Sequence, residues 1–96
     1  MEKFFYRVQS NDTVFSLSEK FGVPPVKLIK DNGLSEEILE GDILYIERVT
    51  DRLYVVTPSD TLSSISQRFN VPAEKILLDN NIPYIFYGLT IAIKNN

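Results

Sequence analysis

Residues 6–34 read YRVQSNDTVFSLSEKFGVPPVKLIKDNGL, and residues 54–82 read YVVTPSDTLSSISQRFNVPAEKILLDNNI. Aligned without a gap, the two stretches are identical at 12 of 29 positions. The match resumes after a deletion of one residue in the second stretch, so that Gly41 aligns with Gly88. Repetition of this kind is typical of a chain built from repeated structural units. Two copies of one unit therefore make up nearly the whole chain.

Each copy is predicted to begin with a strand that leads through a turn into a helix. The β-prone runs FFYRV at 4–8 and LYVV at 53–56 precede the turn-forming clusters SND and PSD. Apolar residues at helical spacing follow them, and these residues are Val14, Leu17, Phe21, Leu62, Ile65 and Phe69. A Val-Pro pair then separates this helix from a second one, because proline suits the first turn of a helix.

The second half of each copy is predicted to hold another helix and a closing strand. The second helix is expected to end at Asn32 or Asn80, since Asn and Gly tolerate a left-handed turn at a helix C-terminus. We expect these two asparagines to end the helix and to tie the two loops of the unit together. The runs ILYIE at 43–47 and TIAIK at 90–94 are predicted as closing strands with alternate residues facing inward.

The predicted fold class is α+β, with two β-α-α-β units, each a two-stranded antiparallel sheet with two helices on one face. We place the units at residues 5–47 and 53–94 and a short linker at 48–52. Five residues span at most about 17 Å, and this linker holds no Gly or Pro. If both units bind one polymer, the second contact is intramolecular and strengthens weak single-site binding.

Composition excludes several classes of protein. The 96 residues are 44% hydrophobic and 24% charged, which is ordinary for a globular protein. Ten Lys and Arg against thirteen Asp and Glu give a net charge of −3, and no basic stripe is present, so nucleic-acid binding is not expected. The chain has no Cys and no His, which removes the usual nucleophile–base pairs and metal ligands. We therefore expect no enzyme, no metal and no cofactor.

The sequence also bears on cellular location. Its longest apolar runs are too short to span a membrane, so no membrane insertion is expected. The opening MEKFFYRVQSND lacks the apolar core of a secretory signal. We expect a location in the cytoplasm if Met1 is the native start, and at the cell wall or envelope if the chain is a fragment or a mature form.

The repeated unit resembles the lysin motif (LysM), a β-α-α-β module that typically binds glycans containing N-acetylglucosamine. The resemblance rests on Y-x-V before a turn, D-T-[VL]-x-x-[LI]-S-x-x-F, V-P, [LI]-x-x-x-N and G-x-x-[LI]-x-I. Both copies carry every element, and almost nothing of the chain lies outside them. The family often has Gly before Asp-Thr, where this chain has Asn11 and Ser59. Because the loops are altered most in the first copy, binding is expected more in the second.

The resemblance places the sugar in a shallow groove between the two loops of each unit. The glycan-binding residues that it implies are Ser10, Asn11, Asp12, Thr13, Val14, Gly33, Leu34 and Ser35 in the first unit, and Pro58, Ser59, Asp60, Thr61, Leu62, Asn81, Ile82, Pro83 and Tyr84 in the second. Backbone groups on rigid turns suit hydrogen bonds to an acetamide, and apolar side chains shelter its methyl group.

Several of these residues also have a structural interpretation. The Asp-Thr pairs lie at helix starts, where their oxygens cap free N–H groups for about 1 kcal/mol. Tyr84, Phe86 and Tyr87 lie close together, and such rings either stack on sugars or pack beneath their own loop. We expect Ile82→Asp to weaken glycan binding without unfolding the second unit.

The acidic residues are concentrated in the first copy. Residues 1–48 carry six basic and nine acidic side chains, with Glu36, Glu37, Glu40 and Asp42 in the second loop. A glycosidase needs two carboxyl groups at fixed separation across a deep cleft, which a unit of this size does not offer. A solvated face is the simplest interpretation, while repulsion of anionic wall polymers and recruitment of a basic protein partner are both open.

Two functional hypotheses follow. The first is a non-catalytic binder of peptidoglycan or of another N-acetylglucosamine polymer such as chitin. The second is an intracellular assembly module that uses the same fold for protein interaction, as similar modules do in spore-coat and phage-tail proteins. Sedimentation with wall sacculi distinguishes the two.

Overall fold

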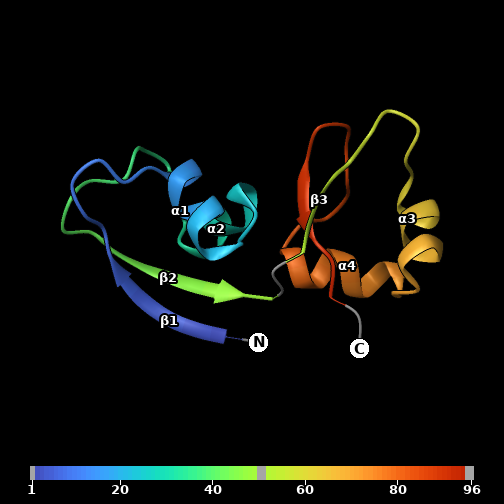
Figure 1. The fold of residues 1–96 in the computed structure, drawn as a ribbon, viewed down its shortest axis with the longest axis horizontal. Helices are drawn as coiled ribbons and strands as arrows, with labels where there is room; N and C mark the ends of the chain where they lie inside the picture. Colours follow the sequence, from blue (N-terminus) through green and yellow to red (C-terminus); the bar gives the residue numbers. More distant parts are fainter. Residues whose placement is uncertain (1, 50–51, 95–96) are drawn as a thin grey trace.

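The computed structural model describes residues 2–49 and 52–94, and its elements follow the order predicted from the repeat (Figure 1). In the first unit, repeat 1, these are β1 (Glu2–Arg7), α1 (Val14–Phe21), α2 (Pro25–Asp31) and β2 (Ile43–Arg48). In the second, repeat 2, they are β3 (Leu53–Val55), α3 (Leu62–Phe69), α4 (Ala73–Asn80) and β4 (Thr90–Ala92). The predicted α+β class with two β-α-α-β units is confirmed.

The two strands of each unit pair in antiparallel fashion. In repeat 1 Glu2 lies opposite Arg48 and Arg7 opposite Ile43, and in repeat 2 Leu53 lies opposite Ala92. The second sheet is shorter than predicted, because β4 ends at Ala92. Each sheet has two strands, and a two-stranded sheet is only marginally stable in water without a covering layer. The helices are therefore needed to complete each core.

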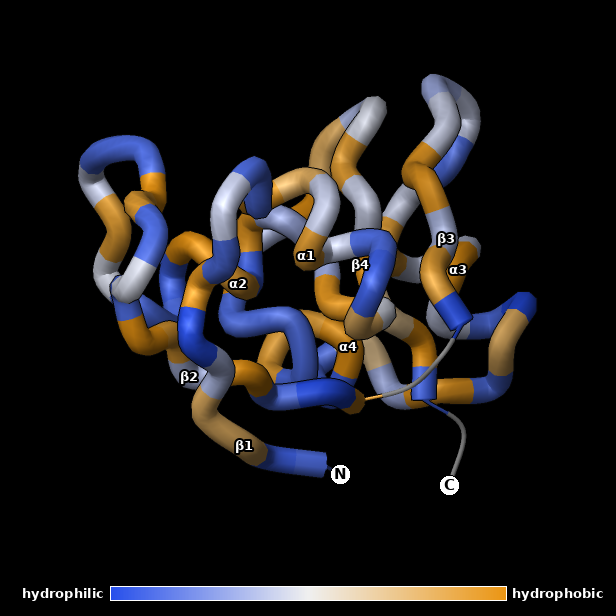
Figure 2. The backbone as a smooth tube through the Cα atoms, turned by 60° about the vertical axis from the view of Figure 1, so that its left-hand side comes forward, coloured by the Kyte–Doolittle hydropathy of each residue, from blue (hydrophilic) through white to orange (hydrophobic). Residues whose placement is uncertain are grey.

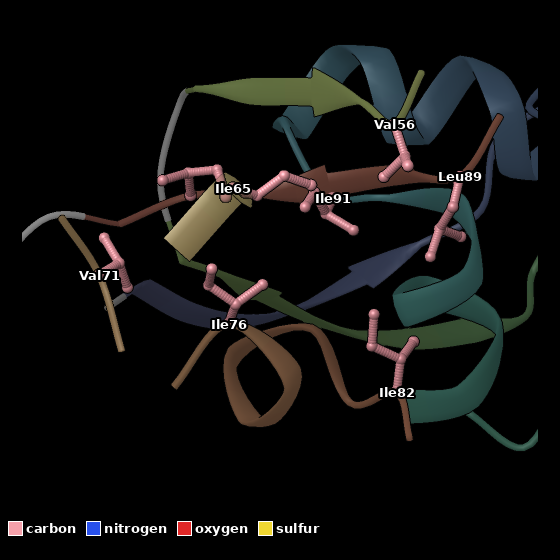
Figure 3. Packing of buried hydrophobic residues seen from close by; sticks show 8 residues of the cluster. Val56, Ile65, Val71, Ile76, Ile82, Leu89 and Ile91 are labelled. Carbon is pink, nitrogen blue, oxygen red and sulfur yellow. The ribbon is translucent and has the colours of Figure 1, made fainter. Parts of the chain in front are cut away.

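Each unit has its own hydrophobic core. The core of repeat 1 is formed by Val8, Leu17, Val23, Leu28, Ile38, Leu44 and Ile46. The core of repeat 2 is formed by Val56, Ile65, Val71, Ile76, Ile82, Leu89, Ile91 and Ile93, which converge in Figure 3. The inward positions predicted in the closing strands, Leu44 and Ile46 and Ile91 and Ile93, are therefore confirmed, but strict alternation fails in repeat 2, where Ala92 is also buried. Hydrophobic and hydrophilic segments alternate at short intervals along the tube in Figure 2, as expected for elements with one buried face.

Left-handed residues end the helices. Gly22 follows α1 with φ 68°, and Asn70 follows α3 with φ 55°. After α2 and α4, the same role falls to Gly33 (φ 58°) and Asn81 (φ 55°). In each case the residue after the left-handed one donates its backbone N–H to the carbonyl of the residue five positions earlier. Leu34, for example, donates to the Ile29 carbonyl at 3.0 Å. The use of Asn and Gly predicted at the ends of α2 and α4 is confirmed, and the same device at the ends of α1 and α3 was not predicted.

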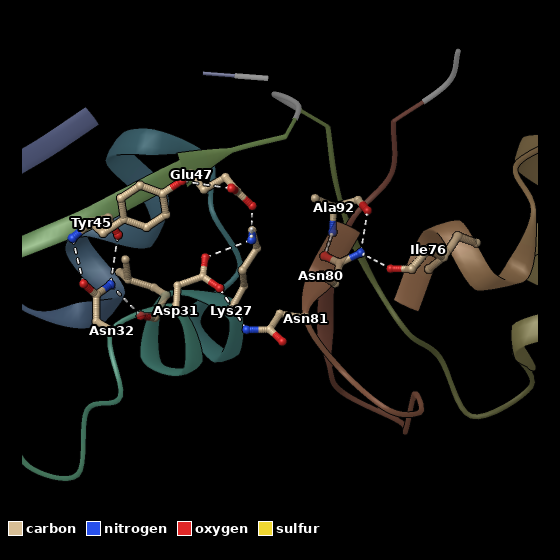
Figure 4. A network of polar contacts seen from close by, with 10 residues as sticks. Lys27, Asp31, Asn32, Tyr45, Glu47, Ile76, Asn80, Asn81 and Ala92 are labelled. Atoms are coloured by element: carbon tan, nitrogen blue, oxygen red, sulfur yellow. Dashed lines mark hydrogen bonds and ion pairs between the residues drawn. The ribbon is translucent and has the colours of Figure 1, made fainter. Parts of the chain in front are cut away.

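The units contact each other through α2 of repeat 1. Val26 packs against the core cluster of repeat 2, and the Asn81 side chain donates a 2.9 Å hydrogen bond to Asp31 (Figure 4). Of the predicted linker 48–52, Arg48 belongs to β2 and Val49 is buried. Residues 50 and 51 lie outside the described residues.

A buried lysine lies beside this contact. The Lys27 ammonium is 2.8 Å from Asp31 and 2.9 Å from Glu47, and its side chain is 2% exposed. Burial by itself lowers the pKa of Lys27, but the hydrogen bonds and charges of Asp31 and Glu47 outweigh it and raise that pKa. The equivalent Lys75 of repeat 2 pairs with Asp79 and is 25% exposed.

Within the described residues, no helix is long and apolar enough to cross a membrane.

Candidate functional site

The first loop of repeat 1 is anchored by Asp12. One of its carboxylate oxygens accepts the Tyr6 hydroxyl at 2.7 Å and the Gln9 N–H at 2.8 Å. These hydrogen bonds, that of Tyr6 first, lower the pKa of Asp12. The carboxylate therefore ties the loop to β1 and fixes the turn from which α1 begins.

Asp60 anchors the first loop of repeat 2 in the same way, with an additional contact to a positively charged side chain. Asp60 accepts the Tyr54 hydroxyl at 2.5 Å and the Thr57 N–H at 2.8 Å. Arg68 contacts the other carboxylate oxygen at 2.9 Å. The Tyr54 and Thr57 hydrogen bonds and the Arg68 charge lower the pKa of Asp60 from 3.8 to about 2. The loop of repeat 2 is thus held by three neighbours.

The two loops differ in backbone conformation at the residue before Asp-Thr. Asn11 has φ 72°, and the Asp12 N–H closes the turn on the Gln9 carbonyl at 3.1 Å, as in a type II turn. Ser59 is not among the residues with positive φ, although the Asp60 N–H closes the same turn on Thr57. Pro58 precedes Ser59 and suits a turn without a left-handed residue. Each sequence therefore uses the turn that its residues permit.

The predicted capping role belongs to the threonines alone. The Thr13 hydroxyl accepts the Ser16 N–H at 3.0 Å, and the Ser16 hydroxyl accepts the Thr13 N–H at 2.9 Å. Thr61 and Ser64 form the same reciprocal capping box. The prediction is wrong for Asp12 and Asp60, because their oxygens accept N–H groups of the preceding turn rather than of the helix.

The second loop of each unit is positioned by an asparagine. The Asn80 amide donates to the carbonyls of Ile76 and Ala92 at 2.7 and 2.8 Å, and its oxygen accepts the Ala92 N–H at 2.6 Å (Figure 4). Asn32 makes the same three bonds, to Leu28 and Tyr45. These residues were predicted to tie two loops together. They instead join the end of the second helix to the closing strand, and so fix where the loop starts.

A hollow of about 630 Å³ lies between the two loops of repeat 1. It is lined by Asp12, Thr13, Val14, Phe15, Ile29, Leu34, Ser35, Glu36, Glu37 and Ile38. Five of these residues are apolar. Asp12, Glu36 and Glu37 are acidic, and the lining includes no basic residue. Concave sites with an apolar surface and a few polar groups are typical small-molecule sites.

The structure brings together part of the predicted site in repeat 1. Asp12, Thr13, Val14, Leu34 and Ser35 line the hollow, and they come from both predicted loops. Ser10, Asn11 and Gly33 are exposed and lie outside this lining. The hollow thus occurs in the repeat whose loops depart more from the family pattern.

The predicted residues of repeat 2 have more varied positions. Pro58, Ser59, Thr61, Pro83 and Tyr84 are exposed, and Asp60 and Leu62 are half-buried. Asn81 reaches across to Asp31 of repeat 1. Ile82 is 9% exposed and belongs to the core (Figure 3). The expectation that Ile82→Asp leaves the unit folded is therefore wrong, since a buried unpaired charge is strongly destabilising.

Five lining residues were not predicted as site residues: Phe15, Ile29, Glu36, Glu37 and Ile38. Phe15 lies beside the apolar stripe of α1 and is 71% exposed, so helical periodicity places it outside the core but does not relate it to the groove. Ile29 is 37% exposed beside the fully buried Leu28. The acidic residues were noted in the loop, but periodicity does not show which loop side chains face a groove.

The lining of the hollow is suited to binding a ligand. Its apolar side chains and the exposed backbone of two fixed turns suit a ligand with apolar and hydrogen-bonding groups. Among the residues that the structure describes, no group of three acidic side chains is placed to hold a metal ion.

Comparisons with known proteins identify the family of the two units. The family model of the LysM domain matches residues 6–46 and 54–94. Among solved structures, the spore cortex-lytic enzyme SleL of Bacillus cereus is 32% identical with a TM-score of 0.47, and the match covers 97% of this chain and 23% of that one. SleL of Bacillus megaterium QM B1551 is 23% identical with a TM-score of 0.48, covering 96% and 22%.

The chain therefore spans less than a quarter of the length of these structures. No curated protein sequence is matched. LysM is a binding domain rather than a catalytic one, and domains of this kind bind glycans that contain N-acetylglucosamine, such as peptidoglycan. With two tandem copies of the β-α-α-β unit, each matched over its length, the chain belongs to the LysM family.

Proposed function

We propose that this chain binds an N-acetylglucosamine-containing glycan, namely bacterial peptidoglycan, without acting on it. The observation that carries the proposal is the hollow of repeat 1, which is lined from both loops and has apolar side chains at Val14, Leu34 and Phe15. An acetamide methyl group suits this apolar lining, and exposed backbone groups of the turns suit the amide and hydroxyls. Such a protein would act at the cell wall or envelope.

Two units on one chain favour a polymeric ligand. Peptidoglycan and chitin repeat the same sugar along one strand, so a second unit binds a ligand that the first already holds nearby. The hydrogen bond between Asn81 and Asp31 and the packing of Val26 on repeat 2 hold the units together. Even weak single sites give useful affinity in this arrangement.

An interaction with a basic protein partner is the second candidate function. Glu36, Glu37 and Glu40 are exposed, and within the described residues no hydrogen bond or ion pair engages them. Free carboxylates of this kind attract a basic surface. In this case the chain would serve as an assembly module, and it would sediment with its partner rather than with cell walls.

The experiment is sedimentation of the purified chain with peptidoglycan sacculi, with soluble N-acetylglucosamine oligomers as competitors. Phe15→Ala tests the hollow, because this ring lines it and is 71% exposed. Phe5→Ala is the matched control, since Phe5 is 73% exposed and is not part of the lining.

We expect the wild-type chain and Phe5→Ala to sediment and to be released by the oligomers, and Phe15→Ala to sediment less. Thermal melts would show the two variants equally folded. No sedimentation of the wild-type chain would overturn the proposal and favour the protein partner.

A further inference from the structure

The second loop of repeat 2 exposes three aromatic rings. Tyr84, Phe86 and Tyr87 are 64%, 51% and 71% exposed. The rings of Tyr84 and Phe86 are 6.2 Å apart between centroids and tilted by 55°. Between them Ile85 is half-buried and packs against the core of repeat 2. The loop is therefore held from inside while its aromatic side chains stay in solvent.

The end of this loop is a closed turn. The Leu89 N–H donates to the Phe86 carbonyl at 3.1 Å, and Gly88 at the third position has φ 90°, as a type II turn requires. The Gly88 N–H in turn donates to the carbonyl of Val56 at 2.8 Å, which fixes the turn to the residue directly after β3. Phe86 and Tyr87 occupy the first two positions of this turn, so their backbone is preorganised before any ligand arrives.

Repeat 1 has the same turn with different side chains. The Asp42 N–H donates to the Leu39 carbonyl at 3.0 Å, and Gly41 has φ 95°. Leu39 and Glu40 hold the places of Phe86 and Tyr87, and the acidic residues Glu36 and Glu37 precede them. In contrast, residues 80–93 of repeat 2 include no charged side chain. The same backbone turn therefore carries acidic side chains in repeat 1 and uncharged aromatic side chains in repeat 2.

We propose that Tyr84, Phe86 and Tyr87 form a stacking platform that binds an additional uncharged sugar ring beside the glycan site proposed for the loops of repeat 2. The inference rests on the proposed glycan binding and assigns the extra subsite to repeat 2 alone. Aromatic faces suit the C–H face of a sugar, and the two tyrosine hydroxyls add polar contacts at its edge. Repeat 1 offers Leu39 and Glu40 at this place, which provide no ring.

The platform directly follows the segment of repeat 2 that is equivalent in sequence to the lining of the hollow in repeat 1. In repeat 1 the lining of the hollow runs through the second loop as far as Ile38, directly before the turn. The equivalent segment of repeat 2 is Pro83, Tyr84 and Ile85, directly before Phe86. In Figure 1 both loops of repeat 2 rise from the same end of that unit. A glycan bound at the loops of repeat 2 would therefore extend onto the rings.

The test is a titration of the full chain with N-acetylglucosamine oligomers of increasing length, followed by aromatic and backbone NMR shifts. The double variant Phe86→Leu and Tyr87→Glu copies the turn of repeat 1 and keeps Gly88, so the turn itself is retained. Leu78→Ala is the control, because Leu78 is 78% exposed on α4 and lies outside the platform.

We expect the longer oligomers to shift the ring signals of Tyr84, Phe86 and Tyr87. The double variant should bind them about three- to tenfold more weakly at repeat 2, with the shortest oligomer and Leu78→Ala unaffected. Equal affinity of the wild-type chain and the double variant for every length would overturn the platform while leaving the proposed function intact. No shifts anywhere in the wild-type chain would overturn both.

Discussion

Asn81, the left-handed residue after α4, donates its side-chain amide to the Asp31 carboxylate of the other repeat at 2.9 Å. The same carboxylate group pairs with the buried ammonium of Lys27 at 2.8 Å. Asp31 is therefore shared between the interior of repeat 1 and the contact between the units. One residue thus links the stability of α2 to the orientation of the two repeats.

Asn81→Gly should loosen the two units while leaving each one folded. Glycine keeps the positive φ of 55° at little cost but removes the amide that reaches Asp31. We expect residual dipolar couplings of the two repeats to require separate alignment tensors, against one shared tensor in the wild-type chain. Asn70→Gly is the matched control, because Asn70 has the same φ at the end of α3. A single shared tensor in Asn81→Gly would contradict the role given to this contact.

Lys27→Met should destabilise repeat 1 by about 3–5 kcal/mol, because removing one partner of a buried ion pair leaves the others uncompensated. Asp31 and Glu47 would both lose the ammonium that they share. Lys75→Met is the control, since among the residues that the structure describes its ammonium pairs only with Asp79, and its side chain is 25% exposed. Its cost should be below about 1 kcal/mol. Urea unfolding of the two variants measures the difference, and equal costs would refute the account.

Acid should weaken the chain through its paired carboxylates. The folded-state pKa is lowered for Asp12 and Glu47 and, for Asp60, from 3.8 to about 2. Groups with a depressed pKa stabilise the fold fully above their unfolded pKa and lose this effect as the pH falls through the folded one. The free energy of unfolding should therefore fall between about pH 4 and pH 2.

Urea unfolding across this pH range measures that fall, with Asp60→Asn as the test variant. We expect Asp60→Asn to be less stable than the wild-type chain at pH 6 and to approach it near pH 2. A constant difference between the two proteins at every pH would show that Asp60 does not stabilise the fold through its charge.

Glu36→Gln with Glu37→Gln should strengthen binding of acidic wall glycan to repeat 1. Both residues line the hollow, and no basic side chain stands beside them in the lining. Their charges repel an anionic ligand, and salt screens exposed charges over about 10 Å at 0.1 M. The gain should therefore shrink as salt increases. Glu74→Gln is the control, because Glu74 is exposed on α4 outside the hollow. Isothermal titration at two salt concentrations measures the affinity of each variant for the glycan. An equal gain in affinity from the double variant Glu36→Gln/Glu37→Gln and from Glu74→Gln would contradict this role.

The fold could be predicted from the sequence because the repeat shows each signal twice. Helical spacing predicted that Leu17 in α1 and Ile65 in α3 face a core, and the structure buries both. Ile91 and Ile93 were predicted to face inward from the closing strand, and they are buried as well. Burial in strands and helices follows a fixed period, so a pattern is sufficient to assign it.

The site was only partly predictable, since loop side chains follow no period. Leu34 and Ile82 hold the same place in the two copies, yet Leu34 lines the hollow and Ile82 is buried in a core. Asp12 was predicted as a helix cap, but its partner Tyr6 lies on the preceding strand and is reached only in the folded chain. Phe15 belongs to no stripe, so only the structure relates it to the groove.

The measurement that tests glycan recognition most directly is an NMR titration of the wild-type chain with N-acetylglucosamine oligomers. Glycan binding should shift the signals of residues 12–15 and 34–38, around the hollow of repeat 1, and those of the corresponding loops of repeat 2. Unchanged spectra at millimolar oligomer, or shifts confined to the outer face of the β1–β2 sheet, would contradict it.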